Sequence, residues 1–248
     1  MYLFCLPYAG GSASSYMIYA KFIDERVRII PVELAGRGAR FQEPFYESLD
    51  DAVIDVFDFI QNYIKNNESY VIWGHSMGAI IAYKVLQYIY HNHYKSPVMA
   101  IYSGRTPPHI PYVPLPVDIL NDQELIDTIA EFGGLSDEIR NNAEFKSVFL
   151  PVIRADFRML SSLANEKNIY FKYDFPITVL HGTRDKKINV ADIKSWRNYT
   201  DSSFVYREFD GDHFFVFQKI HEIAHLLNKL LVNNTKTLDV PNISINLK

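Results

Sequence analysis

The sequence predicts an α/β fold in which a mostly parallel sheet is flanked by helices. Short apolar segments with strand character alternate with amphipathic helical segments along most of the chain. A sharp glycine-containing turn, in YVIWGHSMG at residues 70–78, joins one strand directly to a helix. The alternation fails only between residues 105 and 172, where the pattern predicts a helical insertion between two strands of the sheet.

The predicted strands are short and apolar. We expect them at residues 2–6, 27–33, 70–73, 98–103, 177–181 and 204–209. A helix over residues 49–65 is indicated by Ser48 and Asp51, which form a capping-box pattern before apolar residues that recur on one face. Further helices are expected over residues 79–89, 191–198 and 217–231.

The insertion opens with a cluster of prolines at residues 107–116 and continues as helices over residues 121–132 and 144–163, the second kinked at Pro151. We interpret it as a lid over the carboxyl ends of the strands, where open α/β sheets bind ligands. An ordinary packing subdomain is the alternative. The predicted organisation is a core of residues 1–104 and 173–232, a lid of residues 105–172 and a loosely ordered tail of residues 233–248.

Composition excludes several classes of protein. A chain of 248 residues with 48% hydrophobic residues can bury a large core. Its net charge of −4 argues against nucleic acid as the main partner. No apolar stretch approaches the about 20 residues needed to cross a bilayer, and the N-terminus lacks the pattern of a signal peptide. The lone Cys5 fits a reducing cytoplasm, where we expect it to be a small buried hydrophobe.

The turn at residues 74–78 is the strongest functional signal. Its G-x-S-x-G pattern lies between a strand and a helix, which is the context of the nucleophile elbow in the α/β-hydrolase fold. Such a turn strains the backbone at Ser76, and glycines at 74 and 78 remove the Cβ atoms that would clash where strand and helix meet. Ser76 is therefore the candidate nucleophile.

A serine nucleophile needs a base, and the base needs an orienting acid. In this architecture the chain order is serine, acid, histidine. His213 is the best base because it follows a strand and a turn that contains glycine. The weaker candidates are His91, His93, His109, His221 and His225.

Asp185 is our choice for the acid because it follows a strand and enters a short loop on the same side of the sheet as Ser76. Asp210 and Asp212 are the alternatives. Neighbours on a turn rarely point at the same imidazole nitrogen, so we expect turn-forming roles for both.

The reaction also needs backbone donors for the negative oxygen of the tetrahedral intermediate. One should be the amide of Met77, at the N-terminus of the elbow helix. We assign the second to the amide of Ala9, in the loop with paired glycines after the first strand.

The chain resembles the type II thioesterases, the stand-alone α/β-hydrolases that accompany nonribosomal peptide and polyketide synthases. The blocks that carry this resemblance are LPYAGGSASSY (6–16), VELAGRGAR (32–40), WGHSMGAIIAY (73–83), LPVIRADFRML (150–160) and the pair HGTRD (181–185) and GDHFF (211–215). Together they are highly specific, because they occur in order and at the family's spacings. The chain departs at Ala35, where the family usually has proline, and no catalytic role depends on that position.

The resemblance implies a substrate: an acyl group in thioester linkage to the phosphopantetheine arm of a carrier domain. Hydrolysis would clear misprimed or stalled groups, with no metal or organic cofactor required. We expect a monomer, because no long exposed apolar stripe is evident. A chain-releasing thioesterase or a general small-molecule esterase is the enzymatic alternative. A catalytically inactive scaffold would not be expected to keep Ser76, Asp185 and His213.

Several residues in these blocks have two interpretations. We expect His75 to pack and hydrogen-bond behind the elbow. Arg37 and Arg40 either attract the phosphate of the pantetheine arm or form ion pairs that stabilise their turn. For Arg154 and Asp156 we expect an ion pair within the second insertion helix.

Overall fold

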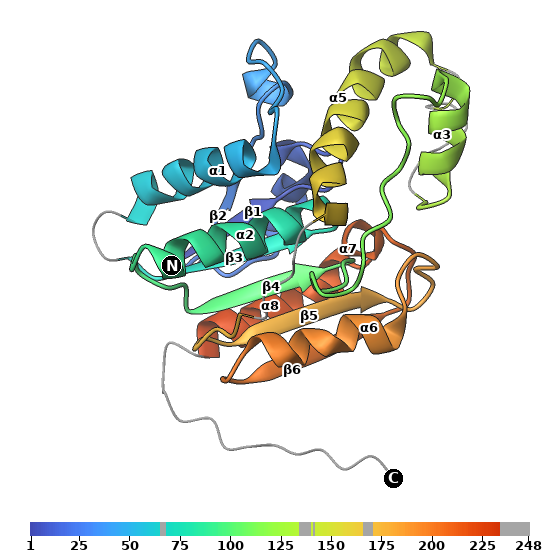
Figure 1. Cartoon of the computed structure of the whole chain (residues 1–248). Helices are drawn as coiled ribbons and strands as arrows, with labels where there is room; N and C mark the ends of the chain where they lie inside the picture. Colours follow the sequence, from blue (N-terminus) through green and yellow to red (C-terminus); the bar gives the residue numbers. More distant parts are fainter. Residues whose placement is uncertain (65–67, 134–139, 141, 166–170, 234–248) are drawn as a thin grey trace.

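A parallel sheet forms the centre of the computed structural model, which describes residues 1–64, 68–133, 140, 142–165 and 171–233 (Figure 1). Within these residues the strand order is β2-β1-β3-β4-β5-β6, and every neighbouring pair is parallel. The strands are β1 (Tyr2–Leu6), β2 (Arg28–Pro31), β3 (Tyr70–His75), β4 (Met99–Ser103), β5 (Ile177–Gly182) and β6 (Phe204–Phe209). The predicted α/β class and its parallel sheet are confirmed.

Burial explains why the sequence located the strands well. Every residue of β3 and β5 is buried, so these strands have continuous apolar runs, as expected for a sheet covered on both faces. The predicted strand over residues 27–33 is too long. β2 spans only Arg28–Pro31, because it lies at the edge of the sheet and pairs on one side only, with residues 2–5 of β1.

Helices cover both faces of the sheet. Those that pack on one face are α1 (Leu49–Ile64), α2 (Met77–His91), α6 (Val190–Lys194) and η4 (Ser195–Tyr199). Those on the other face are η1 (Ala13–Lys21), α7 (Phe215–Gln218) and α8 (Ile220–Asn233). Successive side chains of a strand alternate between these layers: Phe4 joins the first cluster, and Leu3 and Cys5 join the second. Cys5 is a buried free thiol, as predicted.

Two helical predictions need correction, and one helical segment was missed. The helix expected over residues 191–198 is the short α-helix α6 followed directly by the 3₁₀ segment η4. The single C-terminal helix expected over residues 217–231 is two helices, because Lys219 leaves the helical conformation between α7 and α8. The 3₁₀ segment η1 was not predicted at all. Its buried residues, Tyr16 and Tyr19, are three positions apart and pack edge-on against Trp73. That spacing was its one sequence signal.

The first helix of the insertion begins next to the predicted start at residue 121 and ends before the predicted end at residue 132. Asn121 caps α3 (Asp122–Ala130): its Oδ1 accepts from the Glu124 amide at 3.0 Å, and the Glu124 carboxylate accepts from the Asn121 amide at 2.8 Å. This reciprocal pair satisfies two backbone donors that would otherwise lack partners.

The second insertion helix is α5 (Ala143–Ser161), which contains Pro151 and is followed by the 3₁₀ segment η3 (Ser162–Asn165). Together with α3 it encloses a small separate core that includes Leu125, Ile129 and Ile153. Figure 1 shows both helices beyond the carboxyl edge of the sheet.

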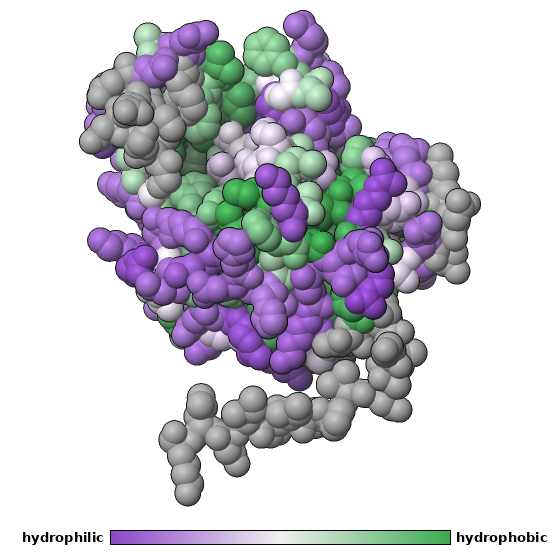
Figure 2. Space-filling view, turned by 180° about the vertical axis from the view of Figure 1, so that it is seen from behind, coloured by the Kyte–Doolittle hydropathy of each residue, from purple (hydrophilic) through white to green (hydrophobic). Residues whose placement is uncertain are grey.

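Parts of three predicted segments lie outside the described residues. These parts are residue 65 of the first helix, residues 134–139, 141 and 166–170 of the lid, and residues 234–248 of the tail. Residue 233 of the expected tail is the last residue of α8. On the face seen from behind in Figure 2, hydrophilic side chains cover much of the lower part and hydrophobic ones gather above them. No helix in the described part of the chain combines the length and apolar character needed to cross a membrane.

Candidate active site

Ser76 lies in a tight turn between β3 and α2, with φ 53° and ψ −113°. A positive φ is strained for a residue with a side chain, and the surrounding backbone holds it in place. The Ser76 amide donates to the Ser103 carbonyl of the neighbouring strand at 2.8 Å. A Cβ atom at Gly74 would lie 2.1 Å from the Gly78 carbonyl oxygen, and one at Gly78 would lie 2.2 Å from the carbonyl oxygen of Leu6. Both glycines are therefore required by close backbone contact.

His213 and Asp185 meet although they are far apart in sequence. Nδ1 of His213 lies 2.7 Å from Oδ2 of Asp185, and both residues are buried, with exposed fractions of 4% and 6%. The other carboxylate oxygen of Asp185 accepts from the Lys187 amide at 3.0 Å. Each residue follows the carboxyl end of a strand, β6 and β5 respectively. Asp185 is thus held by two hydrogen bonds in contact with the imidazole.

The two rejected carboxylates have other partners. Asp210 pairs with Arg184, and both side chains are exposed. Asp212 accepts from the Phe214 amide at 2.8 Å and from Nε2 of Gln218 at 2.9 Å. Asp212 thus has the turn-forming role that the sequence suggested, and Asp210 has a surface ion pair.

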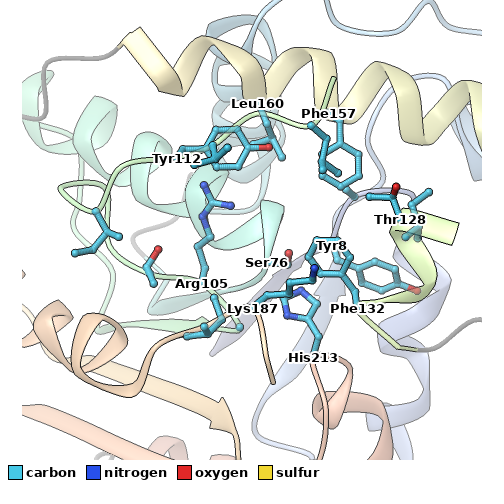
Figure 3. A pocket seen from close by; sticks show the side chains of 18 of the residues that line it. Tyr8, Ser76, Arg105, Tyr112, Thr128, Phe132, Phe157, Leu160, Lys187 and His213 are labelled. Carbon is cyan, nitrogen blue, oxygen red and sulfur yellow. The ribbon is translucent and has the colours of Figure 1, made fainter. Parts of the chain in front are cut away.

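A cavity of about 490 Å³ opens beside Ser76 and His213. Its walls are mainly apolar and come from the loop after β1, the segment after β4 and the helices α3 and α5. Figure 3 shows Ser76 and His213 close together at the cavity, below Phe157 and Leu160 of α5. The rival His109 is not among the residues that line it; its Nδ1 lies 3.0 Å from the Tyr199 hydroxyl.

Ala9 lines this cavity, in the loop after β1, and Met77 is the first residue of α2. The amide of Ala9 has no acceptor among the residues that the structure describes. The Met77 amide belongs to the first helical turn, where a backbone N–H has no partner within the helix. Both predicted donors therefore stand near Ser76 without an intrahelical or loop acceptor.

The loop that carries Ala9 is held by a buried ion pair that the sequence did not predict. Asp156 of α5 accepts from the Gly10 amide at 2.7 Å and binds Arg37 through both carboxylate oxygens at 2.6 and 2.7 Å. Arg37 also donates to the Gly11 carbonyl at 3.3 Å. Arg37 and Asp156 are only 5% and 2% exposed. The pair joins the insertion helix to the loop after β1.

The expected pair between Arg154 and Asp156 is therefore wrong. Residues two positions apart point to different sides of a helix, so these side chains cannot face each other. Arg154 instead binds Asp122 at 2.8 Å and the Leu120 carbonyl at 2.9 Å. Arg37 and Arg40 both form ion pairs, as one of their two interpretations expected. Arg40 pairs with Glu43 of its own turn and binds Asp55 at 2.6 Å, whereas the partner of Arg37 lies in α5 and not in its turn.

His75 is fully buried behind the elbow. Its Nδ1 lies 3.0 Å from the Ser103 hydroxyl, which also accepts from the Trp73 indole at 3.0 Å. Its ring centre is 5.2 Å from that of His213. Burial lowers the pKa of His75 well below its ordinary value of 6.5, and the nearby His213 adds to this. His75 is thus kept neutral, with the packing and hydrogen-bonding role that the sequence indicated.

The fold and the site together define the class: this is an α/β-hydrolase, with a serine at the elbow and a histidine–aspartate pair at the same edge of a parallel sheet. The family follows from comparison with known proteins. The family described as "Thioesterase domain" matches residues 1–231, and the chain belongs to that family.

Individual relatives agree with this assignment. The gramicidin S biosynthesis protein GrsT of Aneurinibacillus migulanus is 31% identical over 229 residues, covering 92% of this chain and 88% of that protein. ClbQ, from the colibactin nonribosomal peptide and polyketide synthase pathway, matches with a TM-score of 0.84 and 28% identity over 94% of this chain and 97% of ClbQ. The type II thioesterase BorB from the borrelidin cluster matches with a TM-score of 0.80 and 26% identity, over 92% and 91% of the two chains. The protein is accordingly a hydrolase that acts on thioesters.

The neutral state of buried His75 predicts a dependence of stability on pH. Its pKa is lower in the folded chain than in the unfolded chain, so the unfolded chain binds the proton first as pH falls. The free energy of unfolding should therefore decrease below pH 6.5, by up to about 1.4 kcal/mol per pH unit from this group. His181, whose pKa is also lowered by burial, contributes with the same sign.

Urea unfolding at pH 7 and pH 5.5 measures this effect. His75→Asn should show a shallower loss of stability than the wild type between these two values. The exposed His221 offers the matched control, since His221→Asn should keep the wild-type slope. Equal slopes for the wild type and His75→Asn would contradict the prediction.

Proposed function

We propose that this enzyme hydrolyses acyl groups from the phosphopantetheine thiol of carrier proteins, and so clears misprimed or stalled modules in nonribosomal peptide or polyketide synthesis. The observation that carries the chemistry is that His213, which contacts Asp185, lines one cavity together with Ser76. Support for the carrier-bound substrate comes from relatives such as GrsT, ClbQ and BorB, which are named for these biosynthetic systems.

In this proposal the Ser76 hydroxyl attacks the thioester carbonyl carbon while His213 takes its proton at Nε2. Asp185, at Nδ1, orients the ring and stabilises the imidazolium that forms. The tetrahedral intermediate then collapses: the carbon–sulfur bond breaks, and the pantetheine thiol leaves with the proton from His213. A water molecule, deprotonated by His213, hydrolyses the acyl-enzyme and returns Ser76 to its starting state.

The amides of Ala9 and Met77 donate to the negative oxygen of both tetrahedral intermediates. The Met77 amide has the added field of the α2 N-terminus. The Ala9 amide depends on the conformation of its loop, which Asp156 and Arg37 hold at the adjacent Gly10 and Gly11.

Residues 105–172 act as the lid of this enzyme, over a core of residues 1–104 and 173–232. Supporting this division, apolar side chains of α3 and α5, such as Ile129 and Phe157, line the cavity at Ser76. A cytoplasmic location and a monomeric state remain predictions from the sequence.

Removal of the nucleophile tests the chemistry. Ser76→Ala should lose nearly all hydrolysis of a short acyl group on a phosphopantetheinylated carrier, because no other residue is proposed to attack the carbonyl. Release of free thiol, followed with a chromogenic reagent, measures the rate. Equal background rates for the wild type and Ser76→Ala would show that the proposed enzyme chemistry is wrong.

The choice of substrate tests the carrier assignment. The wild type should have a higher kcat/KM for butyryl groups on a carrier than for the same group on a small alcohol ester, because the carrier adds binding contacts. Both can be followed by mass spectrometry of released butyrate. Indifference between the two substrates would favour a general esterase.

The Asp156 contact tests the role of the Ala9 loop. Asp156→Asn removes the charge that holds Arg37 and the Gly10 amide, so kcat should fall by about 10–100-fold. This is less than the about 100–1,000-fold loss expected when one oxyanion donor is removed, because the Ala9 amide would be displaced and not lost. Steady-state kinetics should be read at a temperature where circular dichroism shows folded protein, since breaking a buried pair also destabilises a fold. Asp118→Asn, which breaks an exposed pair with Arg158 elsewhere in the insertion, should keep wild-type kcat. A folded Asp156→Asn variant with wild-type kcat would show that the contact of α5 with the Ala9 loop is not needed for catalysis.

A further inference from the structure

Arg105 lies in the wall of the catalytic cavity, directly after β4 and Gly104. Its backbone is well anchored, because its carbonyl accepts from the Trp196 indole at 2.8 Å. Gly104 has φ 60°, and a Cβ atom there would lie 2.6 Å from the His75 ring. The position of Arg105 is therefore determined by the same packing that surrounds the elbow.

The guanidinium group of Arg105 has no ionic partner within the described residues. Among the described residues no carboxylate pairs with it, and its Nε is enclosed without a hydrogen-bond acceptor. Its central carbon lies 4.7 Å from the ring centre of Tyr112, which also lines the cavity. The Tyr112 hydroxyl is likewise enclosed and has no hydrogen-bond partner in the part of the chain that the structure describes. Two neighbouring polar groups are thus unsatisfied at one place.

Of the other charged residues that line the cavity, Lys187 has an ionic partner of its own and Asp192 does not neutralise Arg105. Lys187 binds Glu131 at 2.6 Å. Asp192 lies in α6 and forms no ion pair with Arg105. The other buried or half-buried arginines considered above each bind a carboxylate; they are Arg37, Arg40 and Arg154.

Arg105 is half-buried, and a guanidinium with an enclosed Nε and no counter-ion is unfavourable, because arginine does not lose its proton in proteins. Burial lowers the pKa of the Arg105 guanidinium, and Tyr112 beside it opposes this shift. Stacking on the Tyr112 ring compensates only in part, since a cation over an aromatic face still lacks hydrogen-bond acceptors. An anionic oxygen group entering the cavity would supply the counter-charge that the Arg105 guanidinium lacks.

We propose that Arg105 and Tyr112 form a subsite that binds an anionic oxygen group of the substrate, away from the scissile carbonyl. This inference rests on the proposed function and adds to it a class of substrate. In the view of Figure 3, Arg105 and Tyr112 lie on one side of Ser76, and Phe132 and Thr128 lie on the other. The anion is either a carboxylate at the far end of the acyl group or the phosphate of the pantetheine arm.

Binding to protein that cannot turn over tests the subsite. In the Ser76→Ala background, isothermal titration compares succinyl- with butyryl-pantetheine, which have equal chain length and differ in the terminal carboxylate. A second comparison, of butyryl-pantetheine with butyryl-phosphopantetheine, differs only in the phosphate. The anionic member of one pair should bind more tightly, and adding Arg105→Gln should reduce that preference by about 10–100-fold, as expected for a lost charge-assisted hydrogen bond.

Further variants separate binding from folding. Tyr112→Phe removes one oxygen atom, keeps the ring under Arg105, and should reduce the same preference by about 3–10-fold. Arg207→Gln is the matched control, because Arg207 is exposed on β6 and is not among the cavity residues; the preference should not change. Circular dichroism and thermal unfolding establish that each variant is folded.

The outcomes are distinct. A preference for succinyl that depends on Arg105 assigns the subsite to the acyl group, and a preference for phosphopantetheine that depends on Arg105 assigns it to the arm. If Arg105→Gln leaves both preferences unchanged, or if neither anion is preferred, the subsite proposal is overturned. Turnover by the wild type is measured separately, so loss of the proposed enzyme activity and loss of the subsite give different results.

Discussion

The strained turn at Ser76 is the constraint on which the rest of the site depends. Its positive φ is held by close backbone packing: Gly74 of β3 contacts the start of α2, and Gly78 of α2 contacts the end of β1, so neither position can carry a side chain. The hydrogen bond from the Ser76 amide to Ser103 then joins the turn to β4. With the serine raised at the carboxyl edge of the sheet, the loops after β5 and β6 can bring Asp185 and His213 to it. Without this strained turn, the Ser76 hydroxyl would not lie at the edge of the sheet where these loops place Asp185 and His213.

A second constraint connects the insertion to the core. Arg37 and Asp156 are both buried, and their ion pair also holds the backbone on either side of the Gly10–Gly11 bond. Breaking such a pair is costly because each partner would remain as an unpaired charge in the interior. Near residue 156, α5 is therefore part of the structure that surrounds the catalytic loop. This arrangement links movement of that part of the helix to the position of the Ala9 amide.

Arg37 is buried and Arg105 is half-buried, and their guanidinium groups have opposite surroundings. Arg37 is satisfied within the chain by a carboxylate that contacts it through both oxygens. Arg105 stacks on Tyr112 and lacks a carboxylate partner in the described residues, although it lies in the cavity beside the nucleophile. The first environment provides rigidity. The second leaves binding capacity unused in the free protein, which is the expected property of a recognition site.

The amino-acid sequence alone determined the α/β class, the approximate strand positions and the candidate residues Ser76, Asp185 and His213. These features depend on short windows of the chain: an apolar run, a glycine pair around a serine, or a polar residue just after a strand. The predicted bounds differ from the structure at β2, which pairs on one side only and is shorter, and at Lys219, which divides the last helix. A local pattern of residues does not predict which other segments a strand or helix will contact.

Only the tertiary structure decided which charges meet. Arg37 and Asp156 are 119 positions apart, and no local pattern couples them, so the sequence suggested a partner on the wrong side of the helix. The isolation of Arg105 is also a tertiary property. Whether a charge has a partner depends on every segment that folds around it, whereas a strand or a tight turn depends mainly on the conformational preferences of its own residues.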